Sequence, residues 1–292
     1  MRSDRRASLV SNGFLRSHAP EQLHPLFRGL APTLNIAHRG GALVAPENTL
    51  AAFEIALGKY RVDMLELDVH QTRDGVIVVS HDSTIDRCTN GSGAIADLAI
   101  ADLAEWDAGF RFSPDGGATF PFRGRGIRIP PLRQVFQAFP RALFNIEVKA
   151  RTAGIVERFA AVIRDAKSAG RVCCGSESDE LAAELAQALP EGCHFYPRQA
   201  LIELVSAIRQ GRPPPADDRY RVIDLALEYQ GTRLIDAQLL DTARRIGRWV
   251  NVWTVDEPSE MRRLVREGVG GIMTDRPDLL REVLSERQSA QG

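Results

Sequence analysis

Short apolar segments alternate with helical patterns from residue 34 to about residue 280. Nine segments are short and apolar enough to be buried strands: 34–38, 64–69, 76–81, 143–149, 171–174, 192–196, 221–227, 250–255 and 270–275. Apolar residues at helical spacing predict helices between most of them: 47–60, 153–168, 177–189, 199–209, 236–247 and 257–267. Continuously apolar strands separated by helices indicate a parallel sheet that is covered by helices on both faces.

Two architectures have such a sheet, the (β/α)8 barrel and the open doubly wound fold. The first strand is not followed by a GxGxxG or GxxxxGK[ST] turn, which disfavours a nucleotide-binding open sheet. We therefore predict an α/β fold of the (β/α)8 TIM-barrel type. Because nine candidate strands are one too many for this barrel, one of them must lie outside the ring.

The domain organisation is predicted as one barrel over residues 34–284. Residues 1–33 are polar, rich in arginine and interrupted by three prolines, so we expect a loosely structured leader, and residues 285–292 are expected to form a C-terminal tail. The segment at about 83–140 has little helical periodicity. Because loop-rich segments of this length are uncommon inside compact domains, we expect an inserted cap. It contains a cluster of aromatic residues, Phe110, Phe112, Phe120 and Phe122.

Composition excludes several classes of protein. The chain has 37 Lys and Arg against 38 Asp and Glu, which argues against a nucleic-acid partner bound through bulk charge. No apolar run approaches the ~18 residues of a membrane span, and the first residues lack the apolar core of a secretory signal. We therefore expect no stable membrane insertion and a cytoplasmic location. Composition does not determine the oligomeric state.

Charged and histidine side chains gather where the predicted strands end. Side chains alternate across a strand, so Glu66 and Asp68 share one face of the strand at 64–69. Glu147 and Lys149 share a face of a later strand. Two further strands end directly in a histidine, His38 and His81. Because barrel sites are built at the carboxyl ends of the strands, we expect these groups to meet there.

The residue types indicate the chemistry. Three carboxylates without cysteine suit one hard divalent cation, Mg²⁺ or Ca²⁺ rather than Zn²⁺. Two histidines suit a general acid and a general base, and Arg39 and Lys149 add fixed positive charge. A cation, an acid, a base and positive side chains are what phosphodiester cleavage requires, because negative charge grows on the phosphoryl oxygens.

Seven sequence motifs give the chain a resemblance to a known family. In chain order they are AHRGG (37–41), PENTLAAF (46–53), ELDVHQTRDG (66–75), HD (81–82), NIEVK (145–149), VWTVD (252–256) and GIMTDRPD (271–278). In this combination the chain resembles the glycerophosphodiester phosphodiesterases over roughly residues 34–280. The resemblance implies a TIM barrel with a small subdomain inserted after His81.

The resemblance also implies roles for single residues. It implies metal ligands at Glu66, Asp68 and Glu147, an acid/base pair at His38 and His81, and phosphate contacts at Arg39 and Lys149. Trp253 is expected to form an apolar wall of the substrate site, and Mn²⁺ is a further candidate metal. Glu47 and Asn48 match the family's PENT turn and are expected to support the site. Asp275 follows the last strand. It is expected either to take part in the site or to cap the turn at Pro277.

The implied reaction converts a small glycerophosphodiester into an alcohol and sn-glycerol 3-phosphate, with a cyclic phosphate as intermediate. One alternative in the same fold is a lysophospholipase D that acts on single-chain lipids, and another is an inactive ligand-binding barrel. At two places the chain departs from the family pattern. Glu177 stands where the family usually has an aromatic residue, and residues 228–230 replace a His-Pro or Val-Pro pair. The alcohol group therefore stays open.

Overall fold

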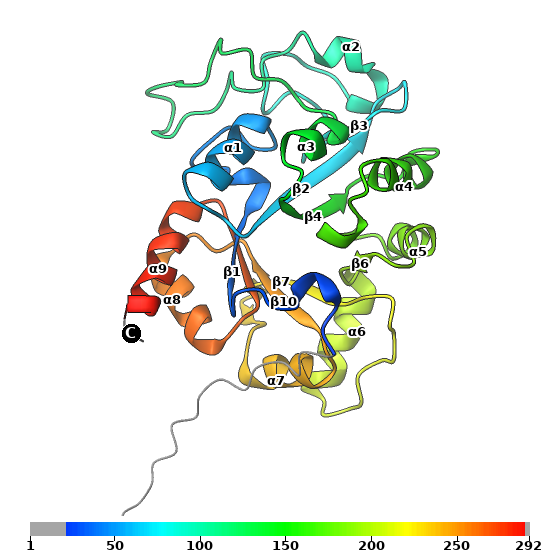
Figure 1. Ribbon diagram of the computed structural model, residues 1–292, viewed down its shortest axis with the longest axis vertical. Coiled ribbons are helices and arrows are strands. Elements are labelled where there is room, and N and C mark those ends of the chain that lie inside the picture. Colours follow the sequence, from blue (N-terminus) through cyan, green and yellow to red (C-terminus); the bar gives the residue numbers. More distant parts are fainter. Residues whose placement is uncertain (1–21, 290–292) are drawn as a thin grey trace, which may run out of the picture.

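Eight parallel strands form the ring at the centre of the molecule (Figure 1). The structure is a computed structural model that describes residues 22–289. In ring order the strands are β6 (Cys193–His194), β5 (Val172–Gly175), β4 (Leu143–Val148), β2 (Met64–Gln71), β1 (Leu34–Ala37), β11 (Gly271–Thr274), β10 (Trp249–Trp253) and β7 (Val222–Ala226). Between β7 and β6, the Tyr196 N–H donates to the carbonyl of Val222 at 2.8 Å. The predicted TIM barrel is thereby confirmed.

The ninth candidate strand is β3 (Ile77–Val79), which pairs with β2 outside the ring. The pairing is antiparallel, with Val69 opposite Val79. Only residues 72–76 separate the two strands, whereas a parallel connection needs a crossover of a dozen or more residues. The connection is therefore a hairpin, in which Gly75 adopts a positive φ of 85°.

Helices surround the ring (Figure 1). They are α1 (Leu50–Gly58), α3 (Leu132–Ala138), α4 (Ile155–Asp165), α5 (Asp179–Ala188), α6 (Arg198–Arg209), α7 (Ala237–Arg245), α8 (Pro258–Glu267) and α9 (Pro277–Ser289). Several begin with a side-chain cap, for example Ser178, whose hydroxyl accepts from the Leu181 N–H, and Asp236, which accepts from the Leu239 N–H. None of the helices in residues 22–289 is both long and apolar enough to cross a bilayer.

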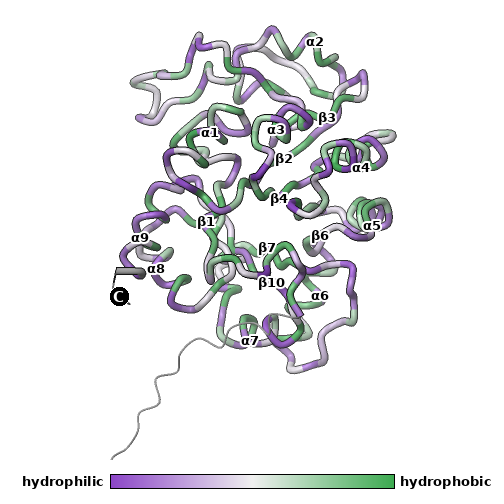
Figure 2. Tube along the Cα trace, viewed as in Figure 1, coloured by the Kyte–Doolittle hydropathy of each residue, from purple (hydrophilic) through white to green (hydrophobic). Residues whose placement is uncertain are grey.

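The strand β2 shows how alternate residues place their side chains on the inner and outer faces of the barrel. Leu65, Leu67 and Val69 are fully buried between the sheet and the helices. Glu66 and Asp68, on the other face, point into the ring, as the alternation predicts. Figure 2 shows hydrophilic residues interrupting the otherwise hydrophobic strands at β2 and β4.

The start of the described chain differs from the expected loose leader. Leu23 and Leu26 are 7% exposed and Phe27 is 2% exposed, and they pack with the lower interior of the ring. Phe27, in the short helix η1 (Pro25–Phe27), stacks on Trp249 with ring centroids 4.7 Å apart. These apolar side chains are buried because they close the amino-terminal end of the ring. The expectation for residues 1–21 lies outside the described residues.

The inserted segment is shorter than expected and ends before α3. Leu132, Val135 and Phe136 of α3 belong to the main core, so this helix is part of the barrel's outer layer. The remainder contains the short helices η3 (Ile95–Asp97) and α2 (Ile100–Leu103) and lies beside β3 at one end of the barrel (Figure 1). Its own small core is aliphatic and consists of Val78, Ile85, Ile95, Leu103, Ala108 and Ile129.

The four phenylalanines of the cap lie outside that small core and are half-buried. Phe112 and Phe122 make an edge-to-face contact at 5.4 Å. The guanidinium of Arg123 lies 4.2 Å from the Phe110 ring and 3.7 Å from the Phe120 ring. At the other end of the chain, residues 285–289 continue α9 instead of forming a tail, and residues 290–292 lie outside the described range.

We expect Phe27→Ala to destabilise the protein by about 3–5 kcal/mol, because the substitution removes a buried ring and leaves a cavity beneath Trp249. Thermal or denaturant unfolding measures this loss. Phe112→Ala is the matched control, since that ring is half-buried in the cap, and it should cost clearly less. An equal effect of both substitutions would show that residues 22–33 do not contribute to the core.

Candidate active site at the carboxyl end of the barrel

Of the eight predicted site residues, His38, Arg39, His81 and Lys149 follow strands and Glu147 and Trp253 lie at strand ends, whereas Glu66 and Asp68 lie within β2. Six of them are joined by short contacts: His38, Arg39, Glu66, Asp68, Glu147 and Lys149. His81 follows β3 and connects to this group through other side chains. Trp253 ends β10 and is 38% exposed.

A tight turn after β1 positions the first two residues. His38 and Arg39 lie in η2 (His38–Gly40), where Arg39 has a positive φ of 52°. Gly40 also has a positive φ, and a Cβ atom there would come within 2.8 Å of the Phe53 ring. The turn directs the Arg39 N–H at Glu66, whose Oε2 accepts it at 2.8 Å. The glycine is thus required for a close approach that holds Glu66.

Two cations lie among the carboxylates. The Lys149 Nζ lies 2.8 Å from Glu147 Oε2 and 3.2 Å from Asp68 Oδ1. The Arg39 Nε lies 3.6 Å from Asp68 Oδ2. Asp68 and Glu147 are register partners on neighbouring strands, which brings their side chains to the same level of the ring.

The carboxylates have too little positive charge around them. Burial raises the pKa of Glu147 to about 7, although Lys149 counteracts the shift. Burial and the charge of Asp68 also raise the pKa of Glu66. Burial disfavours the Lys149 ammonium, but Asp68 and Glu147 outweigh it and raise its pKa to about 12. Since burial disfavours the charged forms of both glutamates, a further cation would stabilise them.

The donor set suits a hard divalent cation. Glu66, Asp68 and Glu147 offer only oxygen atoms. The side chain of Asn48 donates its Nδ2 to Asp68 at 3.1 Å, while its buried Oδ1 has no hydrogen-bond partner. In the part of the chain that the structure describes, no three His, Cys, Asp or Glu side chains are drawn together tightly enough to enclose an ion. The residues fit a metal by their chemistry, and Lys149 compensates part of their charge in this arrangement.

His38 is oriented by an aspartate. Its Nδ1 lies 2.7 Å from Oδ1 of Asp275, which directly follows β11. Burial lowers the pKa of His38, but the hydrogen bond to Asp275 and the charge of Glu66 outweigh it, so the net pKa is raised. Asp275 is therefore a partner of His38 in addition to its place before Pro277. The signals in the sequence were its position at a strand end and its place in the motif GIMTDRPD.

His81 has a similar partner, its neighbour Asp82, with Nδ1 and Oδ1 2.7 Å apart. Arg87 donates to both Asp82, at 2.7 Å, and Glu47, at 2.6 Å. The bond from Arg87 and the bond from His81 lower the pKa of Asp82 to about 2. Glu47 also accepts a hydrogen bond from Arg39 at 3.2 Å. Through Arg87 and Glu47, Asp82 beside His81 is therefore linked to Arg39 beside His38. Sequence analysis did not predict a role for Arg87, because this residue lies in the inserted segment and not at the end of a strand.

A polar layer lies below the carboxylates inside the ring. Asp224 of β7 accepts from the side-chain amides of Asn145 and Asn251, both at 2.8 Å. Asn251 in turn accepts from the indole N–H of Trp249 at 2.9 Å. Burial raises the pKa of Asp224 to about 6 despite its two amide partners. Sequence analysis did not single out Asp224, because it lies in mid-strand.

Comparison with known proteins decides the family. The model of the glycerophosphoryl diester phosphodiesterase family matches residues 38–279. The chain belongs to this family. It is 32% identical, over 253 residues, to a glycerophosphodiester phosphodiesterase of Caldanaerobacter subterraneus subsp. tengcongensis, covering 85% of this chain and 96% of that protein. The family resemblance inferred from the motifs is thus confirmed, and with it the prediction of an enzyme of this class.

Two further relatives show the range of the family. A protein of Rattus norvegicus named lysophospholipase D is 27% identical over 297 residues, covering 93% of this chain and 92% of its own length. The crystal structure of a glycerophosphodiester phosphodiesterase from Agrobacterium tumefaciens superposes with a TM-score of 0.70 at 27% identity, covering 86% of this chain and 99% of that one. The roles of the single residues stay predictions.

We expect Asp275→Asn to lower the pKa of His38, because the substitution removes a negative charge and the hydrogen bond that favours the imidazolium. Proton NMR titration of the imidazole in metal-free protein measures the shift. The stability that this pair contributes is full below about pH 6.5 and is lost as the pH rises through the raised pKa. The control is Asp278→Asn, whose carboxylate pairs with Arg276 instead. A His38 titration unchanged by Asp275→Asn would contradict the assignment.

Proposed function

We propose that the protein hydrolyses glycerophosphodiesters to an alcohol and sn-glycerol 3-phosphate with the aid of one divalent cation. The observation that carries this proposal is the cluster at the carboxyl end of the barrel, where three carboxylates, two basic side chains and the aspartate-bound His38 meet, with the aspartate-bound His81 linked to them through Arg87 and Glu47. The names of the relatives supply the substrate class.

Arg39 and Lys149 are proposed to hold the phosphoryl oxygens. The Nε of Arg39 is buried and has no hydrogen-bond partner in the structure, so it is a donor that an anionic oxygen would satisfy. Lys149 is one of only three lysines in a chain that otherwise uses arginine. Its compact ammonium already lies among the carboxylates at the site.

Glu66, Asp68 and Glu147 are proposed to hold the cation, Mg²⁺ or Ca²⁺, with Mn²⁺ as a further candidate. A bound divalent ion would stabilise the negative charge that grows on the phosphate oxygens. The raised pKa values of the two glutamates support this role, because burial disfavours their charged forms and a bound cation would offset that cost. The carboxylates would be held in place by the Arg39 N–H and the Asn48 amide.

His38 and His81 are proposed to divide the proton transfers. Each ring is tied through Nδ1 to an aspartate, which leaves Nε2 to face the substrate. His38 would take the proton from the glycerol hydroxyl next to the phosphate, and that oxygen would displace the alcohol to give a cyclic phosphate. His81 would protonate the departing alcohol oxygen. Water would then open the ring with the two roles reversed.

A lysophospholipase D activity is the second candidate, because the relative from Rattus norvegicus carries that name. The exposed Glu177 affects this choice. Its negative charge contributes to the raised pKa of Glu147, so it lies near the site. Its carboxylate is paired with Arg198, and such a polar pair favours a polar alcohol over an acyl chain. The inactive barrel is disfavoured because both histidines and all three carboxylates are present.

We expect EDTA to abolish the release of sn-glycerol 3-phosphate from glycerophosphocholine, and addition of Mg²⁺, Ca²⁺ or Mn²⁺ in turn to show which ion restores it. Glu66→Gln should weaken metal affinity, and bound metal should raise the Tm of the wild type, because binding to the folded state stabilises it. Glu203→Gln, an exposed glutamate on α6, is the matched control. Full activity in EDTA would refute the role of the metal. A lysolipid in the same assay tests the second candidate.

We expect His81→Ala to reduce kcat on glycerophosphocholine by about 10²–10⁴-fold, the usual cost of losing a general acid. The loss should be much smaller on a glycerophosphodiester with a nitrophenol leaving group, which departs without protonation. His38→Ala should lose activity on both substrates, because the proposed base is needed for each. Equal losses of His81→Ala on both substrates would show that His81 is not the acid.

A further inference from the structure

Arg87 lies in the inserted segment, shortly after His81, and its guanidinium holds two carboxylates at once. Its Nε and Nη2 donate to the two oxygens of Asp82, at 2.7 and 3.2 Å. Its Nη1 and Nη2 donate to the two oxygens of Glu47, at 2.6 and 2.8 Å. Although the side chain is 48% exposed, every nitrogen of the guanidinium is engaged. Such paired hydrogen bonds fix the orientation of both partners, which a single exposed ion pair does not.

The backbone that carries Arg87 is anchored on both sides. Ile85 is 1% exposed and belongs to the small aliphatic core of the cap. Thr89 is fully buried, and its hydroxyl donates to the Ile85 carbonyl at 2.8 Å, while its N–H donates to the same carbonyl at 3.1 Å. Arg87 is therefore presented from a closed turn, so little further entropy is lost when its side chain binds the two carboxylates.

The two carboxylates lead to different parts of the site. Oδ1 of Asp82 lies 2.7 Å from Nδ1 of His81, whereas Oε1 of Glu47 accepts from Nη1 of Arg39 at 3.2 Å. Glu47 keeps that second cation when Arg87 is removed. Among the ion pairs of residues 22–289, Asp82 has no partner besides Arg87 and His81 itself. The contribution of Arg87 is therefore greater on the side of His81.

Arg87 also sets the charge of the group that His81 contacts. Its hydrogen bonds lower the pKa of Asp82 to about 2, and the bond to His81 adds to this effect. An ionised Asp82 accepts the Nδ1 proton of His81, so the proton that His81 can give away is the one on Nε2. On another side, Nε2 of His70 lies 3.0 Å from the carbonyl oxygen of His81. The ring and the backbone of His81 are thus held by separate contacts.

We propose that Arg87 is a positioning residue for the departure of the alcohol. It holds Asp82 in the orientation that directs Nε2 of His81 at the leaving oxygen, and it does not contact the substrate itself. This inference rests on the proposed function, in which His81 is the acid. It gives the cap a role in the reaction, because the turn at Ile85 and Thr89 supplies the residue that orients the acid.

The test compares Arg87→Gln with the wild type on glycerophosphocholine and on a glycerophosphodiester with a nitrophenol leaving group. We expect kcat on glycerophosphocholine to fall by about 10–100-fold, the usual cost of losing a group that orients a functional side chain. KM should stay close to its wild-type value. The loss should be much smaller on the nitrophenol substrate, which departs without protonation. That retained turnover also shows that the variant is folded.

A double variant shows whether Arg87 acts through His81. On glycerophosphocholine, His81→Ala/Arg87→Gln should be no slower than His81→Ala, because a residue that only orients His81 then has nothing to orient. Independently of activity, a carbon-13 NMR titration should find a higher pKa for Asp82 in Arg87→Gln than in the wild type. The matched control is Arg133→Gln, which removes a similarly exposed arginine, at 57%, from an ion pair with Asp165 and should leave kcat unchanged.

The inference fails if kcat on glycerophosphocholine is unchanged, if both substrates lose activity equally, if the double variant is slower than His81→Ala, or if the titration of Asp82 does not move. A rise in KM alone would also overturn it, because the effect would then lie at Arg39 and the phosphate. Failure of the proposed function looks different, since His81→Ala itself would lose activity equally on both substrates. If only the present inference fails, His81→Ala keeps the contrast between the substrates and Arg87→Gln lacks it.

Discussion

Three carboxylates inside the upper barrel are the constraint on which the site depends. Taking such charges out of water is unfavourable unless cations and donors surround them. Lys149 contacts Asp68 and Glu147, and the Arg39 N–H binds Glu66, yet the pKa of Glu147 is still raised to about 7. The divalent ion that we propose would complete this balance. Glu66 needs a hydrogen-bond donor, and this need explains the close approach of the turn after β1. Only that approach brings the Arg39 N–H to Glu66.

The two ends of the ring differ in charge and in construction. The carboxyl end gathers carboxylates, and the amino end gathers arginines around an apolar closure formed by Phe27 and Trp249. Between them, Asp224 and its two asparagine partners form a hydrogen-bonded layer. In TIM barrels the carboxyl end holds catalysis, whereas the amino end serves stability.

Much of the fold and of the site could be predicted because both depend on periodicity along the chain. In β2 the period of two separates Leu65, Leu67 and Val69 from Glu66 and Asp68, and the structure places the two sets on opposite faces. The strand that did not belong to the ring could not be identified from its residues, since β3 is as apolar as the others. Its short connection to β2 makes it antiparallel. Within the described residues, the segment at 23–27 is packed although the leader is polar in composition, because Leu23, Leu26 and Phe27 supply the contacts.

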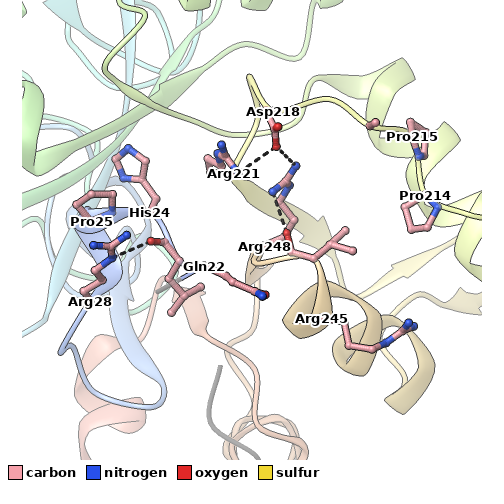
Figure 3. A pocket seen from close by; sticks show the side chains of 13 residues that line it. Gln22, His24, Pro25, Arg28, Pro214, Pro215, Asp218, Arg221, Arg245 and Arg248 are labelled. Carbon is pink, nitrogen blue, oxygen red and sulfur yellow. Dashed lines mark hydrogen bonds and ion pairs between the residues drawn. The ribbon is translucent and has the colours of Figure 1, made fainter. Parts of the chain in front are cut away.

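The sequence by itself determined the strand and helix order, the residues that face the barrel interior and the motifs that assign the family, because each of these depends on neighbours along the chain. Only the tertiary structure decided which side chains become partners. The contact of His38 with Asp275 joins residues 237 positions apart, and Arg87 joins Glu47 to Asp82 across the cap. A cavity at the amino-terminal end of the ring likewise combines three distant segments, at residues 22–28, 214–221 and 245–248 (Figure 3). Such contacts form only when the ring closes. Closure brings together strand ends and loops that are far apart along the chain, and their separation in sequence does not predict their distance in space.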